Sequence, residues 1–143
     1  MKTKLYLLIV ICILFVILLF IHIGCQQINE FYSQLDPVLI TIKNTLQSLN
    51  PDVVEQLHFF EGEKSYTINK KKIYLCLKDD KGDYYDMNML IYVAIHELSH
   101  VLCDEIGHTP KFHQIFQENL EKAIQLGIYD PNIPILDEYC GHT

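Results

Sequence analysis

An uncharged apolar run, LYLLIVICILFVILLFIHI at residues 5–23, is the feature that most restricts how this chain can fold. A helix needs about 20 apolar residues to cross a bilayer, whereas the apolar core of a cleavable signal peptide has only about 7–15. A helix that is apolar on every side needs protein or lipid on every side, and the rest of this 143-residue chain is too small to surround it. We therefore predict an N-terminal transmembrane anchor over residues 1–25.

The flanking charges predict the orientation of this anchor. Lys2 and Lys4 precede the apolar run, and no Lys or Arg follows it before Lys43. This asymmetry favours a cytoplasmic N-terminus and a C-terminal domain on the far side of a membrane. The alternative is cleavage, because HIGC resembles the box at which bacterial lipoproteins are cut and would lipidate Cys25. However, His22 stands where that box has an apolar residue.

Residues 26–143 predict one domain of the α+β class. Apolar residues recur at three- and four-residue steps in residues 29–49, which indicates a helix that Asp36-Pro37 can restart and Asn50-Pro51 ends. Alternation at two-residue steps predicts a short antiparallel hairpin of residues 64–68 and 72–77, with a turn at Asn69. Residues 58–60 can add a further strand.

Two helices are predicted after the hairpin. Asp86 is a suitable cap for a helix over residues 87–106, which Gly107 would stop. Thr109-Pro110 is suited to open the next helix, which Gly127 ends. The tail that follows, with two further prolines, is expected to be extended and packed through Ile128, Ile133, Ile135 and Leu136.

The first of these two helices carries the string HELSH, residues 96–100. His96 and His100 are four residues apart, so they lie on one helix face, about 5–6 Å between Cβ atoms, and can meet one zinc ion. Glu97 is placed to act as general base and acid on a zinc-activated water, and zinc also polarises the scissile carbonyl. The residue types and their order predict hydrolysis of peptide bonds.

Catalytic zinc usually has three protein ligands, so the string alone is incomplete. We expect His108 to be the third, because the chain turns at Gly107 and can fold back over the histidine face. His113 is the second candidate and Glu118 a weaker one. Asp104 lies two turns beyond His96, and we expect its carboxylate instead to orient a ligand imidazole without binding the metal itself.

The segment HELSHVLCDEIGHTPKFHQIF resembles the active-site segment of the WLM and SprT-like metallopeptidases. In those families HExxH on a helix is followed by a glycine-histidine pair and an aromatic residue that opens the next helix, here Gly107-His108 and Phe112. The resemblance implies a zincin-like domain with His96, His100 and His108 as zinc ligands, Glu97 as the catalytic residue and Phe112 as a packing residue. The closing segment GIYDPNIPILDEYCG resembles small anchored members of this group that large DNA viruses encode.

Tyr139 and the cysteines invite further roles. Tyr139 can donate to a tetrahedral oxyanion, although a tail tyrosine more often only packs. In an oxidising compartment two of Cys76, Cys103 and Cys140 can pair, but we expect Cys76 and Cys103 to be small buried apolar residues.

The charge balance limits the partners. The chain has a net charge of −7 and no basic stripe, so we expect no nucleic-acid partner, and the crosslink-repair role of the WLM and SprT-like families does not carry over. The expected partners are a membrane, through residues 5–23, and a peptide or protein substrate. The sequence thus predicts a membrane-anchored zinc metallopeptidase; the alternatives are a zinc-binding interaction module without turnover, and a membrane protein in which the string is accidental.

Overall fold

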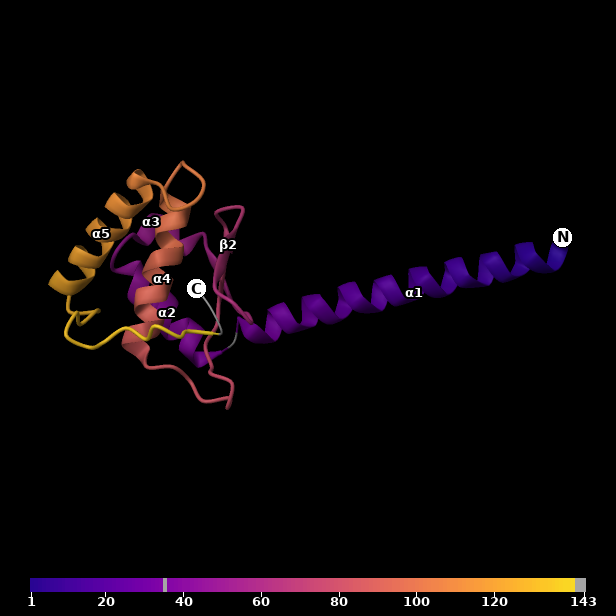
Figure 1. Ribbon diagram of the computed structural model, residues 1–143, viewed down its shortest axis with the longest axis horizontal. Helices are drawn as coiled ribbons and strands as arrows, with labels where there is room; N and C mark the ends of the chain where they lie inside the picture. The colour runs from indigo at the N-terminus through magenta and orange to yellow at the C-terminus, as the bar shows by residue number, and fades with distance from the viewer. Residues whose placement is uncertain (35, 141–143) are drawn as a thin grey trace. The chain divides into compact units, whose positions relative to one another are not determined.

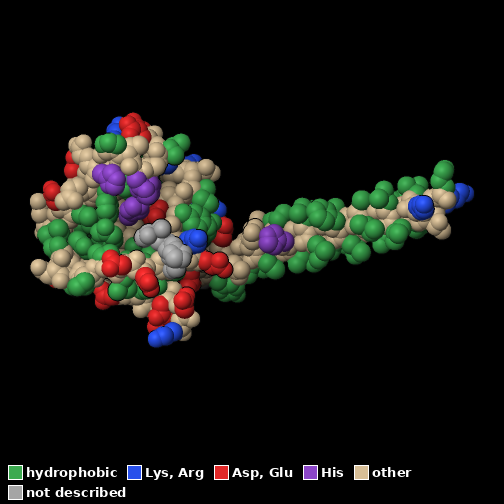
Figure 2. All heavy atoms as spheres, in the orientation of Figure 1, with side chains coloured by type: hydrophobic (Ala, Val, Ile, Leu, Met, Phe, Trp, Pro, Cys, Tyr) green, Lys and Arg blue, Asp and Glu red, His purple; other side chains and the backbone are tan. Residues whose placement is uncertain are grey.

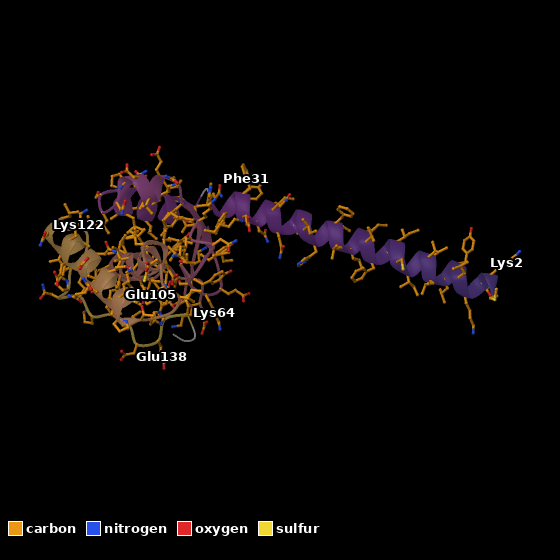
Figure 3. The ribbon with its side chains drawn as sticks, turned by 90° about the horizontal axis from the view of Figure 1, so that it is seen from above. Lys2, Phe31, Lys64, Glu105, Lys122 and Glu138 are labelled. Carbon is orange, nitrogen blue, oxygen red and sulfur yellow. A yellow bond between two sulfur atoms is a disulfide. The ribbon has the colours of Figure 1, made fainter. Side chains whose placement is uncertain are left out.

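The computed structural model describes residues 1–34 and 36–140, and the chain divides into two compact units, residues 1–32 and the part from Ser33 onward (Figure 1). The first unit is formed by α1, Lys2–Ser33, which has no buried residue. Hydrophobic side chains cover its surface in Figure 2, and Figure 3 shows them projecting between Lys2 and Phe31. By length and composition α1 could cross a membrane, a property that signal sequences share. The helix continues past the predicted boundary at residue 25.

The second unit begins with two helices that are each opened by a capped proline. Asp36 Oδ1 accepts from Val38 N at 2.8 Å, which starts α2, Pro37–Gln47, as the sequence predicts. Asn50 caps α3, Pro51–Glu55, in the same manner. Asn50-Pro51 therefore ends one helix and begins another.

The sheet has three strands in the order β1-β3-β2, namely β1 His58–Glu61, β3 Lys72–Leu75 and β2 Tyr66–Ile68. β2 and β3 form the predicted antiparallel hairpin, shorter than expected, around a turn in which Asn69 and Lys70 have φ of 50° and 52°. β1 confirms the further strand that residues 58–60 can add, and it is parallel to β3, so the sheet is mixed. The chain after β1 crosses the end of β3 before it returns along the far edge, which reverses the direction of β2 relative to β1.

The helix that carries HELSH lies at the centre of the unit. This helix, α4, Met87–Leu102, contacts α2, β2 and β3 as well as α5, Pro110–Gln125 (Figure 1). Its N-cap is as predicted, since Asp86 Oδ1 accepts from Asn88 N at 2.8 Å. However, α4 ends at Leu102, four residues before the predicted end, because Cys103 is extended and its carbonyl accepts from Lys70 Nζ in the hairpin turn.

The core is built around the buried face of α4. Ile91, Ile95 and Leu98 are at most 2% exposed and pack with residues of α2 and the sheet in one apolar cluster. The tail after α5 packs less than predicted. Ile128 and Ile135 contact the core, whereas Ile133 and Leu136 remain 41% and 49% exposed.

Candidate metal centre

Two helix positions and one loop position bring three imidazoles together. The buried face of α4 fixes the rotation of the helix, so His96 and His100 are presented together on the opposite side, with ring centroids 5.0 Å apart. The chain then leaves α4 at Cys103 and turns at Gly107, where φ is +85°, a conformation that favours glycine. Thr109 caps α5 directly after His108, so the histidine sits between two fixed points.

The resulting distances fit a metal ion. His108 Nε2 lies 3.0 Å from His96 Nε2 and 3.2 Å from His100 Nε2, and ligand atoms of the three residues all lie within 4.8 Å of one another. A tetrahedral zinc ion with Zn–N bonds near 2.0–2.1 Å requires nitrogens about 3.3 Å apart. The three-imidazole donor set and its spacing therefore suit zinc, and Figure 2 shows histidine side chains gathered on one face of the domain.

Phe112 supports the imidazoles from beneath. It is fully buried, and its ring stacks on that of His100 with centroids 4.2 Å apart and contacts His96 and His108 at 4.9 Å each. A rigid aromatic residue in contact with all three rings restricts their rotation. The packing role that the resemblance implies for Phe112 fits this position.

The environment keeps two of the imidazoles neutral. Burial, and then the neighbouring imidazoles, lower the pKa of His96 from 6.5 to about 4. Burial and His108 lower the pKa of His100 in the same direction. Neutral imidazole is the form that binds metal, so this pair can act as ligands without first losing a proton at neutral pH.

Glu97 is the one buried carboxylate beside the histidines in the described part of the chain, with 5% of its surface exposed. Burial raises the pKa of its carboxyl to about 7, and a hydrogen bond from Thr67 acts in the opposite direction. Thr67 Oγ1 donates to Glu97 Oε2 at 2.7 Å from β2. Thr67 was not predicted from the sequence, because the alternation marks Tyr66 and Ile68 as the apolar positions of this strand, whereas these two side chains are 42% and 39% exposed and Thr67 contacts α4.

The other predicted residues lie outside the group of ligand atoms. His113 has its ring centroid 6.2 Å from that of His108, and Glu118 accepts from Gln114 instead. Asp104 is exposed and pairs with Lys111 Nζ at 2.6 Å, so the structure does not bring it to a ligand imidazole. The metal-ligand group in the described residues consists of His96, His100 and His108.

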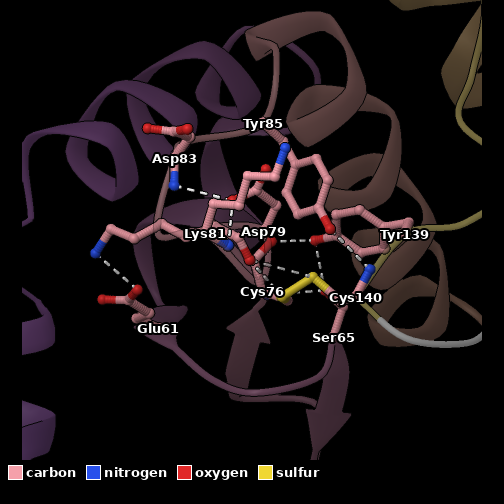
Figure 4. The surroundings of a disulfide bond; sticks show 10 residues. Glu61, Ser65, Cys76, Asp79, Lys81, Asp83, Tyr85, Tyr139 and Cys140 are labelled. Carbon is pink, nitrogen blue, oxygen red and sulfur yellow. Dashed lines mark hydrogen bonds and ion pairs between the residues drawn. A yellow bond between two sulfur atoms is a disulfide. The ribbon is translucent and has the colours of Figure 1, made fainter.

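Tyr139 and two cysteines join the tail to the sheet (Figure 4). Cys76 pairs with Cys140 across 64 residues, so the expectation that Cys76 is an unpaired buried residue is wrong, whereas Cys103 is free and buried as expected. The Tyr139 hydroxyl donates to the Cys76 carbonyl and lies 2.9 Å from Ser65 Oγ. Since this hydroxyl already has two protein partners, its contacts support packing rather than donation to an oxyanion.

A cavity of about 1130 Å³ opens over the histidines and Glu97. Its lining includes residues 64–67, 69 and 70 at the hairpin and residues 135–137, 139 and 140 of the tail. The metal ligands and the carboxylate therefore face a space that can hold a substrate, rather than a closed core.

The chain is similar to several viral proteins. Uncharacterized protein 136R of invertebrate iridescent virus 6 is 53% identical over 94 residues, which make up 64% of this chain and 53% of that protein. Uncharacterized protein R325 of Acanthamoeba polyphaga mimivirus is 42% identical over 86 residues, 54% of this chain and 41% of that protein. The chain thus spans about half the length of these two relatives or less. No family model and no solved structure matches it.

One relative is covered more completely. Uncharacterized protein 042R of invertebrate iridescent virus 3 is 43% identical over 114 residues, which make up 79% of this chain and 70% of that protein. Identity of this degree over more than two thirds of both chains means a common fold. The chain therefore belongs to the same protein family as protein 042R of invertebrate iridescent virus 3.

Proposed function

We propose that this protein is a membrane-anchored, zinc-dependent metallopeptidase of WLM and SprT-like character. The observation that carries the proposal is the convergence of three histidine Nε2 atoms beside the buried carboxylate of Glu97, at the wall of an open cavity. Three imidazoles, a non-ligand glutamate and room for a substrate are the parts that zinc-dependent hydrolysis requires.

The ligand count favours catalysis over a structural metal. Structural zinc sites are closed by four protein ligands, whereas catalytic sites have three and leave one position open. Within the described residues the group offers three ligands, and all three histidines line the cavity. The open position would therefore face the substrate, and this argues against the interaction module.

The residues of the chain have distinct tasks in the proposed reaction. Zinc, when bound, supplies a Lewis acid and an activated water. Glu97, whose carboxylate lies beside the histidines, would accept a proton from the attacking water and pass it to the leaving amine. Thr67 fixes the carboxylate by its 2.7 Å hydrogen bond to Oε2.

The edge of the sheet suits an extended substrate. β2 is an outer strand in the order β1-β3-β2, and its residues line the cavity. A peptide that pairs with the free edge of β2 would pass in front of the histidines, as in binding by strand addition.

The anchor and the disulfide both favour a non-cytoplasmic location for the domain that carries the histidines. Lys2 and Lys4 before the apolar part of α1 favour a cytoplasmic N-terminus. The Cys76–Cys140 disulfide suits an oxidising environment, such as the far side of a membrane offers. We therefore propose that α1 stays in the membrane and that the catalytic unit works on the non-cytoplasmic side.

Metal analysis and one substitution test this function. The purified chain should contain close to one zinc per molecule and should cleave peptides, while Glu97→Gln should retain the zinc and lose about 10²- to 10⁴-fold in rate. Zinc without cleavage by the unsubstituted chain would favour the interaction module. An absence of zinc would refute both metal-based functions.

The ligand assignment has its own test, with a matched control in the same segment. His108→Ala should weaken zinc binding strongly, because it removes one of three ligands. His113→Ala should leave the affinity nearly unchanged, because its ring lies outside the group. The opposite order in a zinc titration would refute the assignment.

A further inference from the structure

The cavity over the histidines has a polar end and an apolar end. At the metal end, His108, Glu105 and Lys70 bring polar and charged groups to the lining. The other end extends along α4 toward its N-terminus. Val93 and Met89 lie there, three and seven residues before His96 and thus on the same helix face, and both also line the cavity.

The tail supplies the opposite wall of the apolar end. Ile135 and Leu136 line the cavity, and Leu136 is 49% exposed, which is unusual for a leucine that is held in place on both sides. In Figure 1 the tail (yellow) crosses α4 near its N-terminal end. Met89, Val93 and Ile135 pack in or against the core, so among the described residues of this end Leu136 is the exposed apolar side chain.

The tail is fixed at two points, one before and one after Leu136. On one side of Leu136, Asp130 N donates to Asn88 Oδ1 at 2.8 Å and Asn88 Nδ2 donates to the Asp130 carbonyl at 3.0 Å. On the other side, Cys140 is bonded to Cys76 and its backbone N donates to the Tyr85 hydroxyl at 3.0 Å (Figure 4). A tail that is anchored twice can discriminate between side chains, because a flexible one would adapt to all of them.

We propose that the apolar end of the cavity is a subsite for one bulky aliphatic or aromatic side chain of an extended polypeptide substrate, with Leu136 as its specificity-determining residue. The inference rests on the proposed peptidase function. The side chain would enter between Val93 and Leu136 while the backbone of the substrate lies along β2. A carboxylate side chain is disfavoured there, because Asp137 is the charged residue among the described lining residues of this end.

The test uses the full-length, zinc-loaded protein in detergent and a mixed peptide pool. Cleavage sites are read by mass spectrometry, and binding of the pool is measured separately on the Glu97→Gln variant, which needs no turnover. One position beside the cut bond should prefer Leu, Ile, Met or Phe over Ala by about 10- to 100-fold, and the bound peptides should show the same enrichment.

Leu136→Asp should abolish this preference and favour Lys or Arg at that position, while Leu136→Met should retain it. Ile133→Asp is the matched control, because Ile133 is 41% exposed on the same tail but does not line the cavity. The side-chain preference of this variant at the substrate position should equal that of the parent protein. Folding of each variant is checked by its zinc content.

The outcomes separate the subsite from the peptidase function. Apolar enrichment in binding without any cleavage would refute the peptidase and keep the subsite. Cleavage without an apolar preference, or an unchanged preference in Leu136→Asp, would refute the subsite and keep the peptidase. If the pool is neither bound nor cleaved, both proposals are refuted.

Discussion

Removal of the Cys76–Cys140 disulfide should lower the free energy of unfolding of the domain by roughly 4 kcal/mol. The bond closes a chain separation of 64 residues, from β3 to the end of the described tail. In the chain-entropy treatment a loop of about 15 residues contributes about 3 kcal/mol and one of about 100 residues about 4.7 kcal/mol, and this loop lies between them. The hydrogen bonds of Tyr139 and Cys140 near the bond would weaken in addition, once the tail moves.

The assay is urea unfolding of the fragment that begins at Ser33, which keeps the whole buried core because α1 contributes no buried residue. With a slope of about 2 kcal/mol per molar urea, a loss of roughly 4 kcal/mol moves the midpoint by about 2 M. Circular dichroism follows the transition, because the chain has 9 tyrosines but no tryptophan, the residue whose fluorescence usually reports unfolding. Cys76→Ser together with Cys140→Ser is compared with the parent.

Reductant provides the control. It should lower the midpoint of the parent to that of the double variant and should leave the variant itself unchanged. The reasoning is refuted if the two proteins unfold at the same urea concentration, or if reductant moves both midpoints equally, because the bond would then constrain nothing.

Three further predictions concern the metal centre. Thr67→Val should lower kcat/KM for peptide hydrolysis about 10- to 100-fold, because it removes a hydrogen bond to a charged group, and the zinc content should stay unchanged. Thr67→Ser keeps the hydroxyl and should preserve the rate. Equal rates in the two variants would contradict a positioning role for Thr67. The metal-free Glu97→Gln domain should lose stability as pH falls from 6.5 toward 4, because burial lowers the pKa of His96 to about 4 and the unfolded chain therefore takes up its proton first. The substitution removes the opposing contribution of Glu97, whose pKa burial raises to about 7, and urea midpoints that agree at pH 7 and pH 4.5 in this variant would refute the prediction. Asp104→Asn should change zinc affinity by less than about twofold, because the exposed carboxylate of Asp104 pairs with Lys111. A loss of about tenfold or more in a competition titration would instead show that Asp104 orients a ligand imidazole.

Local signals in the sequence located the parts of the site that neighbouring residues determine. The four-residue spacing of His96 and His100 places them on one helix face whatever surrounds the helix. Gly107 and Thr109 mark a turn and a cap on either side of His108, so its return to the helix face could be inferred without knowledge of the fold. The proline-opened helices and the hairpin turn were found for the same reason.

The contacts that were missed join segments far apart along the chain. Thr67 reaches Glu97 across 30 residues, Lys70 reaches the Cys103 carbonyl across 33, and Cys76 pairs with Cys140 across 64. No periodicity encodes such a pair, since each depends on how the hairpin and the tail pack against α4. The early end of α4 has the same origin, because the carbonyl of Cys103, the residue directly after the helix, accepts from Lys70 of the hairpin rather than from the next residues of a helix.

These distant contacts determine the geometry of the candidate site, although a local motif supplies most of its functional residues. HELSH supplies two imidazoles and a carboxylate, but α4 alone would leave Glu97 free to rotate and the histidines facing solvent. The hairpin fixes the carboxylate through Thr67, and through Lys70 it ends α4 early enough for His108 to return. The tail, held by the Cys76–Cys140 bond, then closes the side of the cavity that faces the hairpin. A short motif can therefore occur by chance in many chains, whereas a substrate-binding cavity around it requires the hairpin and the tail to be placed beside the same helix.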